Sequence, residues 1–199
     1  MEEKILAPLD LATAGYGPPA SLERTSQPWG HYWDKSKNSF VAFKVDYPNF
    51  FAPVGYIHMS IKDWAKFIIV HLNSDPSDET KLLKSSSLQF LHTPPDSAEW
   101  DFSFKERMGS KFFGYSYLNS NYALGWFAKE KDKGHDLIYH GGRSFAFNDM
   151  VLADLKTKNA ILLVTNTEVS HVHPTVQNLL MIKKIKEHYS KQVELPFTN

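Results

Sequence analysis

The sequence has 199 residues, of which 42% are hydrophobic and 14% aromatic, and its 22 basic side chains balance its 22 acidic ones at a formal net charge of zero. This much apolar surface predicts a globular domain rather than a disordered chain. Zero net charge without a basic stripe argues against nucleic acid as a partner. The longest apolar runs, residues 67–70 and 160–164, are far shorter than the ~20 residues that cross a bilayer, so we expect no membrane span.

Cysteine is absent, which excludes disulfides, thiol catalysis and cysteine-based zinc sites, and nothing in the composition calls for a cofactor. The acidic start, residues 1–6, lacks the apolar core of a secretory signal, and it leaves the cellular compartment undecided.

The first region of the chain is predicted to be a short helix followed by a long loop. The helix covers about residues 1–9, is broken at Pro8 and has no capping residue ahead of it. Residues 15–53 are rich in Pro, Gly, Ser and aromatic residues, which indicates an irregular stretch. So long a loop in a compact domain is typical of a functional region.

The clearest helix is predicted over residues 61–72, with Ser60 as its N-cap and Asp63 completing a capping box. Its apolar residues recur at helical spacing and predict one face packed on a core. They are Ile61, Trp64, Ala65, Ile68 and Leu72. A shorter helix is expected over residues 85–91, followed by a polar loop to about residue 121.

The second region is rich in β-branched and aromatic runs separated by polar turns, which predicts strands. The runs are residues 122–127, 136–140, 147–153 and 160–166, and residues 154–159 join the last two as a hairpin. A helix over residues 174–190 closes the chain. We therefore predict an α+β fold, an antiparallel sheet flanked by helices, in one domain over residues 1–199. Residues 1–121 form its helical and loop region, and residues 122–190 form the sheet and the C-terminal helix.

The sharpest local motif is His140-Gly141-Gly142, predicted at the end of a strand just before a loop. Two glycines at this point let another backbone or a ligand approach closely. Histidine is the side chain best suited to proton transfer near neutral pH, so His140 is a candidate acid, base or polar anchor.

Several segments taken in order carry a resemblance to a known family. They are Pro8-Leu9, residues 55–67, residues 122–126, His140-Gly141-Gly142 and residues 163–166. Together they resemble the C-terminal portion of the serine hydrolases that include class C β-lactamases, D-alanyl-D-alanine carboxypeptidases and related esterases. The resemblance covers about residues 5–190 and implies a partial β-lactamase or DD-peptidase-like fold.

The resemblance also implies roles for individual residues. His140 would be catalytic, and Gly141, Gly142 and Arg143 would bind substrate, the Arg143 backbone N–H as a donor to the oxyanion. It implies hydrolysis of an amide or ester, with a β-lactam, a D-amino-acid peptide or an ester as substrate, and no metal or cofactor.

The other motifs of the family do not match. No serine is followed three positions later by lysine, so the Ser-x-x-Lys nucleophile is absent. Tyr47-Pro48-Asn49 and Tyr117-Leu118-Asn119 have the form of the family's Tyr-x-Asn, but both follow Pro8-Leu9 where the family's motif precedes it. We therefore expect an incomplete domain, without the N-terminal strands and nucleophile helix, that is inactive alone. Asp10 also stands where the family commonly has glycine.

Three functions stay open at this point: the C-terminal part of a hydrolase, a non-catalytic binding or assembly module of the same fold, and a complementing half of a split enzyme.

His171 and His173 have the spacing of two metal ligands on one face of a strand, but no third ligand is evident, and we assign no metal. If the N-terminal strands are missing, residues 160–166 form an exposed sheet edge, and self-association through it is expected.

Overall fold

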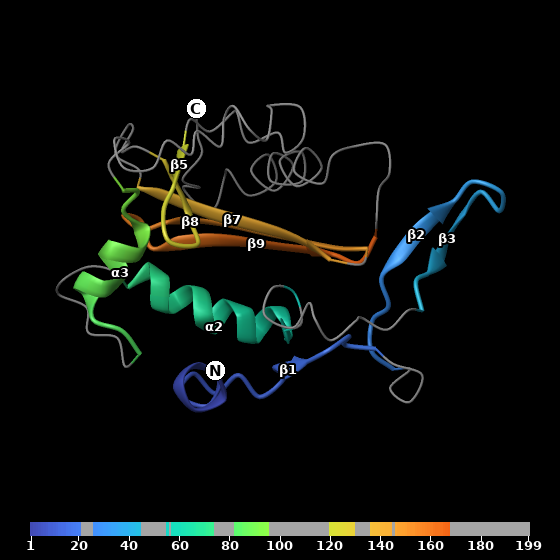
Figure 1. Cartoon of the computed structure of the whole chain (residues 1–199), viewed down its shortest axis with the longest axis horizontal. Helices are drawn as coiled ribbons and strands as arrows, with labels where there is room; N and C mark the ends of the chain where they lie inside the picture. Colours follow the sequence, from blue (N-terminus) through green and yellow to red (C-terminus); the bar gives the residue numbers. More distant parts are fainter. Residues whose placement is uncertain are drawn as a thin grey trace.

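The computed structural model describes residues 1–20, 26–44, 55, 57–73, 82–95, 120–129, 136–144 and 146–167. Its main feature is an antiparallel sheet with a helix along one face, which confirms the predicted α+β class (Figure 1). The predicted closing helix, both Tyr-x-Asn motifs, His171 and His173 lie outside the described residues. No helix in the described ranges is long and apolar enough to cross a membrane.

The sheet has five strands in chain order, each antiparallel to the next. They are β5 (Ser120–Tyr122), β6 (Phe127–Lys129), β7 (Leu137–Ser144), β8 (Phe147–Asp154) and β9 (Asn159–Thr165). The strand predicted over residues 122–127 is wrong, because a turn separates β5 from β6 there. Ala123 donates its backbone N–H to Trp126 O at 2.6 Å, and Gly125 has a φ of +87°, a left-handed conformation that favours glycine.

The predicted hairpin between β8 and β9 is confirmed, and a buried aspartate organises it. The carboxylate of Asp154 accepts backbone N–H groups from Lys156 at 3.0 Å and Thr157 at 3.4 Å, and it also accepts the Thr157 hydroxyl at 2.9 Å. Lys158 then adopts a φ of +55°, which brings the chain back into β9. Asp154 is fully buried, because these donors replace its water.

A second hairpin was missed in the stretch predicted to be irregular. Strands β2 (His31–Asp34) and β3 (Ser39–Ala42) pair with each other and extend away from the sheet (Figure 1). The turn has the same chemistry as the one above: Asp34 accepts the Ser36 backbone N–H at 2.9 Å, and Asn38 has a φ of +49°. Aspartate at the start of such a turn and asparagine at its left-handed position are the signals that sequence analysis passed over.

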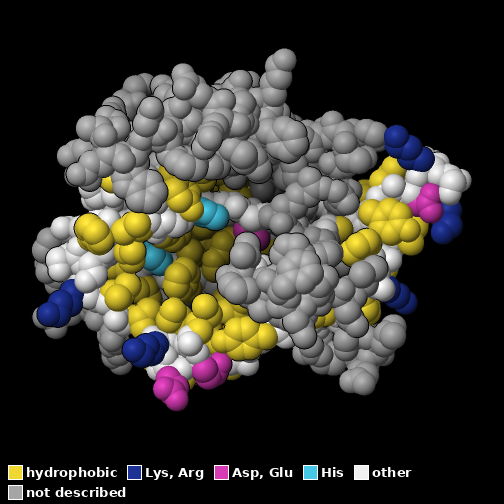
Figure 2. Space-filling model, viewed as in Figure 1, with side chains coloured by type: hydrophobic (Ala, Val, Ile, Leu, Met, Phe, Trp, Pro, Cys, Tyr) yellow, Lys and Arg dark blue, Asp and Glu magenta, His cyan; other side chains and the backbone are white. Residues whose placement is uncertain are grey.

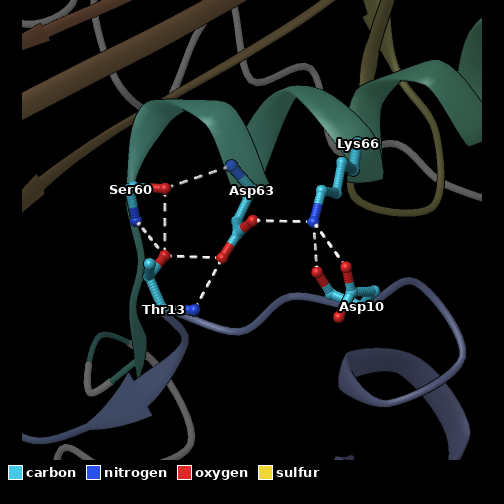
Figure 3. A network of polar contacts seen from close by, with 5 residues as sticks. All are labelled: Asp10, Thr13, Ser60, Asp63 and Lys66. Carbon is cyan, nitrogen blue, oxygen red and sulfur yellow. Dashed lines mark hydrogen bonds and ion pairs between the residues drawn. The ribbon is translucent and has the colours of Figure 1, made fainter.

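Helix α2 (Ile61–Leu72) is confirmed at its predicted bounds, but its cap differs from the predicted capping box. The Ser60 hydroxyl accepts the Asp63 backbone N–H at 3.2 Å as expected. The Ser60 N–H, however, goes to the hydroxyl of Thr13 at 2.9 Å rather than to Asp63. The Asp63 carboxylate instead accepts the N–H and hydroxyl of Thr13, at 2.7 and 2.5 Å, and pairs with Lys66 at 3.1 Å (Figure 3).

This network ties the N-terminal segment to α2. The hydrogen bonds from Thr13 are the main cause that lowers the pKa of Asp63 to about 2. Lys66 also donates to the backbone oxygen of Asp10, whose φ is +51°. Aspartate tolerates this left-handed conformation better than most residues.

The N-terminal helix is shorter than predicted. It is a single π-helical turn, η1 (Glu2–Leu6), ahead of the turn that contains Pro8. Strands β1 (Gly15–Tyr16) and β4 (Ile57–His58) pair beside the start of α2, and helix α3 (Ser85–His92) matches the predicted second helix within one residue.

Both faces of the sheet are covered by apolar side chains. On the α2 face the buried cluster consists of Ile68, Leu72, Trp126, Ala128, Ile138, Val151 and Ala153, with Trp64 and Phe67 packed against it. On the other face it consists of Phe127, Tyr139, Met150, Leu152 and Leu163. The apolar face predicted for α2 is correct at Ile68 and Leu72, which are buried. Ile61, at the start of the helix, is 49% exposed, since most of the buried residues of α2 lie in its second half.

Two histidines are buried between α2 and α3. His71 Nδ1 lies 2.9 Å from His92 Nε2, and both rings pack on Trp126, with ring centroids 4.8 and 5.8 Å away. Burial lowers the pKa of both histidines to about 4, and His92 adds to this effect on His71. Both side chains are therefore neutral at neutral pH.

Candidate functional site

The motif His140-Gly141-Gly142 lies inside a strand rather than at its end, which corrects the sequence prediction. Strand β7 continues through Arg143 to Ser144, because β8 pairs with it along its whole length, from Leu137 opposite Asp154 to Ser144 opposite Phe147. The two glycines are thus held extended in the central strand of the sheet.

The other edge of β7 is only partly paired. Strand β6 pairs with Ile138 and Tyr139, and within the described part of the chain no strand pairs with this edge from His140 to Ser144. Unpaired backbone N–H and C=O groups at a strand edge bind extended ligands by adding them as a further strand. Arg143 lies in this segment, opposite Asn148 in β8, so its backbone is placed at the candidate edge.

His140 is half-buried and lies opposite Val151 in the register of the sheet. Its Nε2 is 3.5 Å from the hydroxyl of Tyr122 in β5, and its ring stacks against Phe127 with centroids 6.1 Å apart. Burial lowers the pKa of His140, and the charge of Asp149 opposes this shift. A neutral imidazole can accept a proton at one nitrogen and donate one from the other.

Asp149 lies opposite Gly142, and its carboxylate occupies the space beside the glycine. A Cβ atom placed on Gly142 would lie 2.9 Å from Asp149 Oδ2 and 3.1 Å from Oδ1, so the carboxylate would have to move to admit a side chain. The carboxylate therefore rests over the backbone of Gly142. Burial raises the pKa of Asp149, whereas a hydrogen bond from the Gly142 backbone and the charge of His140 lower it.

Figure 2 shows, in the same view as Figure 1, a hollow with hydrophobic side chains on its floor and with histidine and acidic side chains among them. Polar groups of this kind on an apolar floor are typical of sites that bind small molecules. In the described ranges no three His, Asp or Glu side chains lie close enough to hold a metal ion.

Sequence analysis missed two residues of this site, Tyr122 and Asp149. Tyr122 was assigned to a strand without a role, and only the β5–β6 turn brings its hydroxyl to His140. A signal for Asp149 was present, since it is the one charged residue in the run 147–153 that was predicted to be a strand. The residues predicted as a capping pair, Ser60 and Asp63, belong to the network around Thr13.

Comparisons with known proteins support the family and the fold. The sequence model of a family described as Beta-lactamase matches residues 1–184. No curated protein matches the chain.

Three solved structures have a similar fold. One is D-amino acid amidase from Ochrobactrum anthropi SV3, solved in complex with L-phenylalanine amide. Its TM-score is 0.61 at 16% sequence identity, and the match covers 94% of this chain and 50% of the amidase chain. The octameric penicillin-binding protein homologue from Pyrococcus abyssi has a TM-score of 0.58 at 17% identity, over 98% of this chain and 41% of its own. D-stereospecific amidohydrolase from Streptomyces sp. has a TM-score of 0.56 at 15% identity, and the match covers 83% of this chain and 42% of the amidohydrolase chain. This chain therefore spans half or less of the length of these structures.

Proposed function

The chain belongs to the β-lactamase family, and on this premise we propose that it forms the substrate-binding part of a hydrolase that cleaves an amide or ester bond through an acyl-enzyme. The observation that carries the proposal is the edge of β7 from His140 to Ser144, with which none of the described strands pairs, next to a histidine whose pKa is lowered by burial. An extended substrate bound along this edge places its carbonyl within reach of the imidazole.

Each residue of the motif has a role in this proposal. His140 acts as the acid, base or polar anchor beside the reacting carbonyl. Gly141 and Gly142 let the substrate approach the strand, and the backbone N–H of Arg143 donates to the oxyanion that forms when the carbonyl is attacked.

The nucleophile is not among these residues. No serine in the sequence is followed three positions later by lysine, so we propose that a Ser-x-x-Lys outside these 199 residues supplies it. The domain is then incomplete, and this chain alone is inactive, because nucleophile and base act as a unit. A non-catalytic binding module of the same fold is the alternative that the missing serine motif also favours.

The names of the similar structures favour one class of substrate. Two of them are a D-amino acid amidase and a D-stereospecific amidohydrolase. We therefore propose an amide of a D-amino acid or a short D-peptide, ahead of β-lactams and simple esters. The shared fold alone does not determine the substrate, since function resides in the site.

Binding is tested by titrating the ¹⁵N-labelled chain with D-phenylalanine amide and following the backbone amide signals. The expected result is saturable shifts concentrated in residues 140–144, with residues 31–42 of the separate β2–β3 hairpin as the internal control. Shifts scattered over the surface, or none at all, would contradict the proposed site.

Catalysis is tested separately. The purified chain should hydrolyse neither D-phenylalanine amide, a chromogenic cephalosporin nor p-nitrophenyl esters above the buffer rate. When it is mixed with a polypeptide that carries the family's Ser-x-x-Lys, turnover should appear, and His140→Ala should lower it by about 100-fold. Binding without turnover in every such mixture would favour the non-catalytic module. Acylation of a serine in the isolated chain, seen by intact mass, would refute the assignment of the nucleophile to other residues.

A further inference from the structure

The carboxyl group of Asp149 lies in a partly desolvated place at the candidate site, and burial raises its pKa. In the register of the sheet it lies opposite Gly142 and two residues from Val151, so it shares the face of His140. Its two oxygens lie 2.9 and 3.1 Å from the point where a side chain on Gly142 would begin. The absence of a side chain at Gly142 therefore leaves the carboxylate against the backbone of β7, in the segment where no described strand pairs with the second edge of β7.

No cation in the described part of the chain neutralises this carboxylate. The described ion pairs involve Lys37 and Lys66, and both lie elsewhere. The groups that favour its charged form are the Gly142 backbone and His140, and burial disfavours the protonated form of His140. A desolvated carboxylate without a cation is costly, and binding a cation removes that cost.

We propose that Asp149 is a specificity residue that binds the primary ammonium group of the substrate, so that the site selects amides or esters with a free amino group. This inference rests on the proposed function, and it defines the class of substrate more closely. The same carboxylate repels ligands that present a carboxylate at this point, which selects against anionic β-lactams.

The spacing along β7 fits a small substrate. Gly142 and His140 are two residues apart on one face of a strand, which places them roughly 7 Å apart. A single amino-acid amide spans this separation when its ammonium group meets Asp149 and its carbonyl group lies beside His140, with a hydrogen bond at each end. An N-acetyl group would remove the positive charge and add bulk over Gly142.

The test compares two ligands that differ only at the amino group. Binding of D-phenylalanine amide and N-acetyl-D-phenylalanine amide is measured by calorimetry at about pH 6.5, below the usual pKa of an α-amino group. We expect the native chain to bind the free amine at least ~10-fold more tightly, as a charge-assisted hydrogen bond would give. Asp149→Asn should reduce this preference to less than about 3-fold.

Two further variants make the result specific. Asp34→Asn removes a carboxylate from the β2–β3 hairpin and should leave the preference unchanged. Gly142→Ala retains the charge but displaces the carboxylate by contact with the new methyl group, so it should weaken the preference as well. Thermal unfolding of each variant checks that it is folded, and the comparison of ligands on the native chain needs no variant.

The outcomes separate this inference from the proposed function. Equal affinity of the native chain for both ligands, or a preference that survives Asp149→Asn, would overturn the role of Asp149 and leave the β7 binding site intact. Failure of the native chain to bind either ligand would overturn the binding site, and this inference with it.

Discussion

The buried pair His71 and His92 should make the stability of the protein fall as the pH drops from 6.5 to about 4. The pKa of each histidine is lowered from 6.5 to about 4 in the folded protein, mainly by burial. Between these values the unfolded chain binds more protons than the folded one. The stabilisation is therefore complete above pH 6.5 and is lost as the pH falls through the folded-state pKa.

The magnitude follows from the size of the shift. A shift from 6.5 to about 4 corresponds to about 3 kcal/mol for one histidine, at 1.36 kcal/mol per pKa unit. The two histidines are in contact and titrate together, so twice this value, about 6 kcal/mol, is an upper bound for the pair. The free energy of unfolding changes by at most about 1.4 kcal/mol per pH unit for each proton that unfolding takes up. Burial raises the pKa of Asp149, so the folded protein holds a proton there more readily than the unfolded chain. This group therefore adds stability as the pH falls, which opposes the effect of the histidines.

The assay is urea unfolding of the native chain and of the double variant His71→Gln, His92→Gln at several pH values from 7.5 to 4.5. Glutamine keeps hydrogen-bonding groups at both positions but does not titrate, so the slope between pH 6.5 and 4.5 should be shallower in the variant. Leu88→Ala, in α3 beside His92, is the control: this side chain is fully buried, so stability should fall by about 2–5 kcal/mol at every pH with an unchanged slope. The same pH slope in the native chain and the double variant would refute the reasoning.

Three other outcomes are expected. Thr13→Val keeps the shape of the side chain but removes its hydroxyl bonds to Ser60 and Asp63, so the free energy of unfolding should fall by about 1–2 kcal/mol in urea. Gly125→Ala places a methyl group in open space at a φ of +87°, so backbone strain alone should cost about 1 kcal/mol, and Gly125→Asn should cost less. Strand β9 has β8 as its only partner among the described strands, so Val164→Lys, at a side chain that is 47% exposed, should reduce self-association in light scattering. A monodisperse native monomer at high concentration would contradict this last expectation.

Local signals in the sequence were enough to predict the elements that depend on neighbouring residues. Ser60 caps α2, which begins at the predicted residue. The β8–β9 hairpin likewise follows from the turn residues after Asp154. The errors occur where a partner from far along the chain decides the structure. Thr13 takes the cap contact that Asp63 was predicted to make, although 50 residues separate them.

The site was predicted in part for the same reason. The chemistry of His140 and the glycines beside it can be recognised from the motif His140-Gly141-Gly142 alone. The contact of Gly142 with the side chain of Asp149 on the next strand, in contrast, appears only when the register of the two strands is known. Tyr122 likewise reaches His140 through a turn that was predicted as a continuous strand.

That register depends on residues remote from the site. Side chains alternate across a strand, so a slip of one residue would move His140 to the other face of the sheet and take Tyr139, which is fully buried, out of its apolar cluster. Asp154 opposes such a slip, because its carboxylate accepts the backbone N–H of Asp136 at 3.2 Å, just before β7, and also organises the turn into β9. The pairing of β7 with β8 is thereby fixed at the end opposite to the glycines. The face on which His140 and Asp149 meet is thus determined by a buried aspartate at the far end of the same two strands.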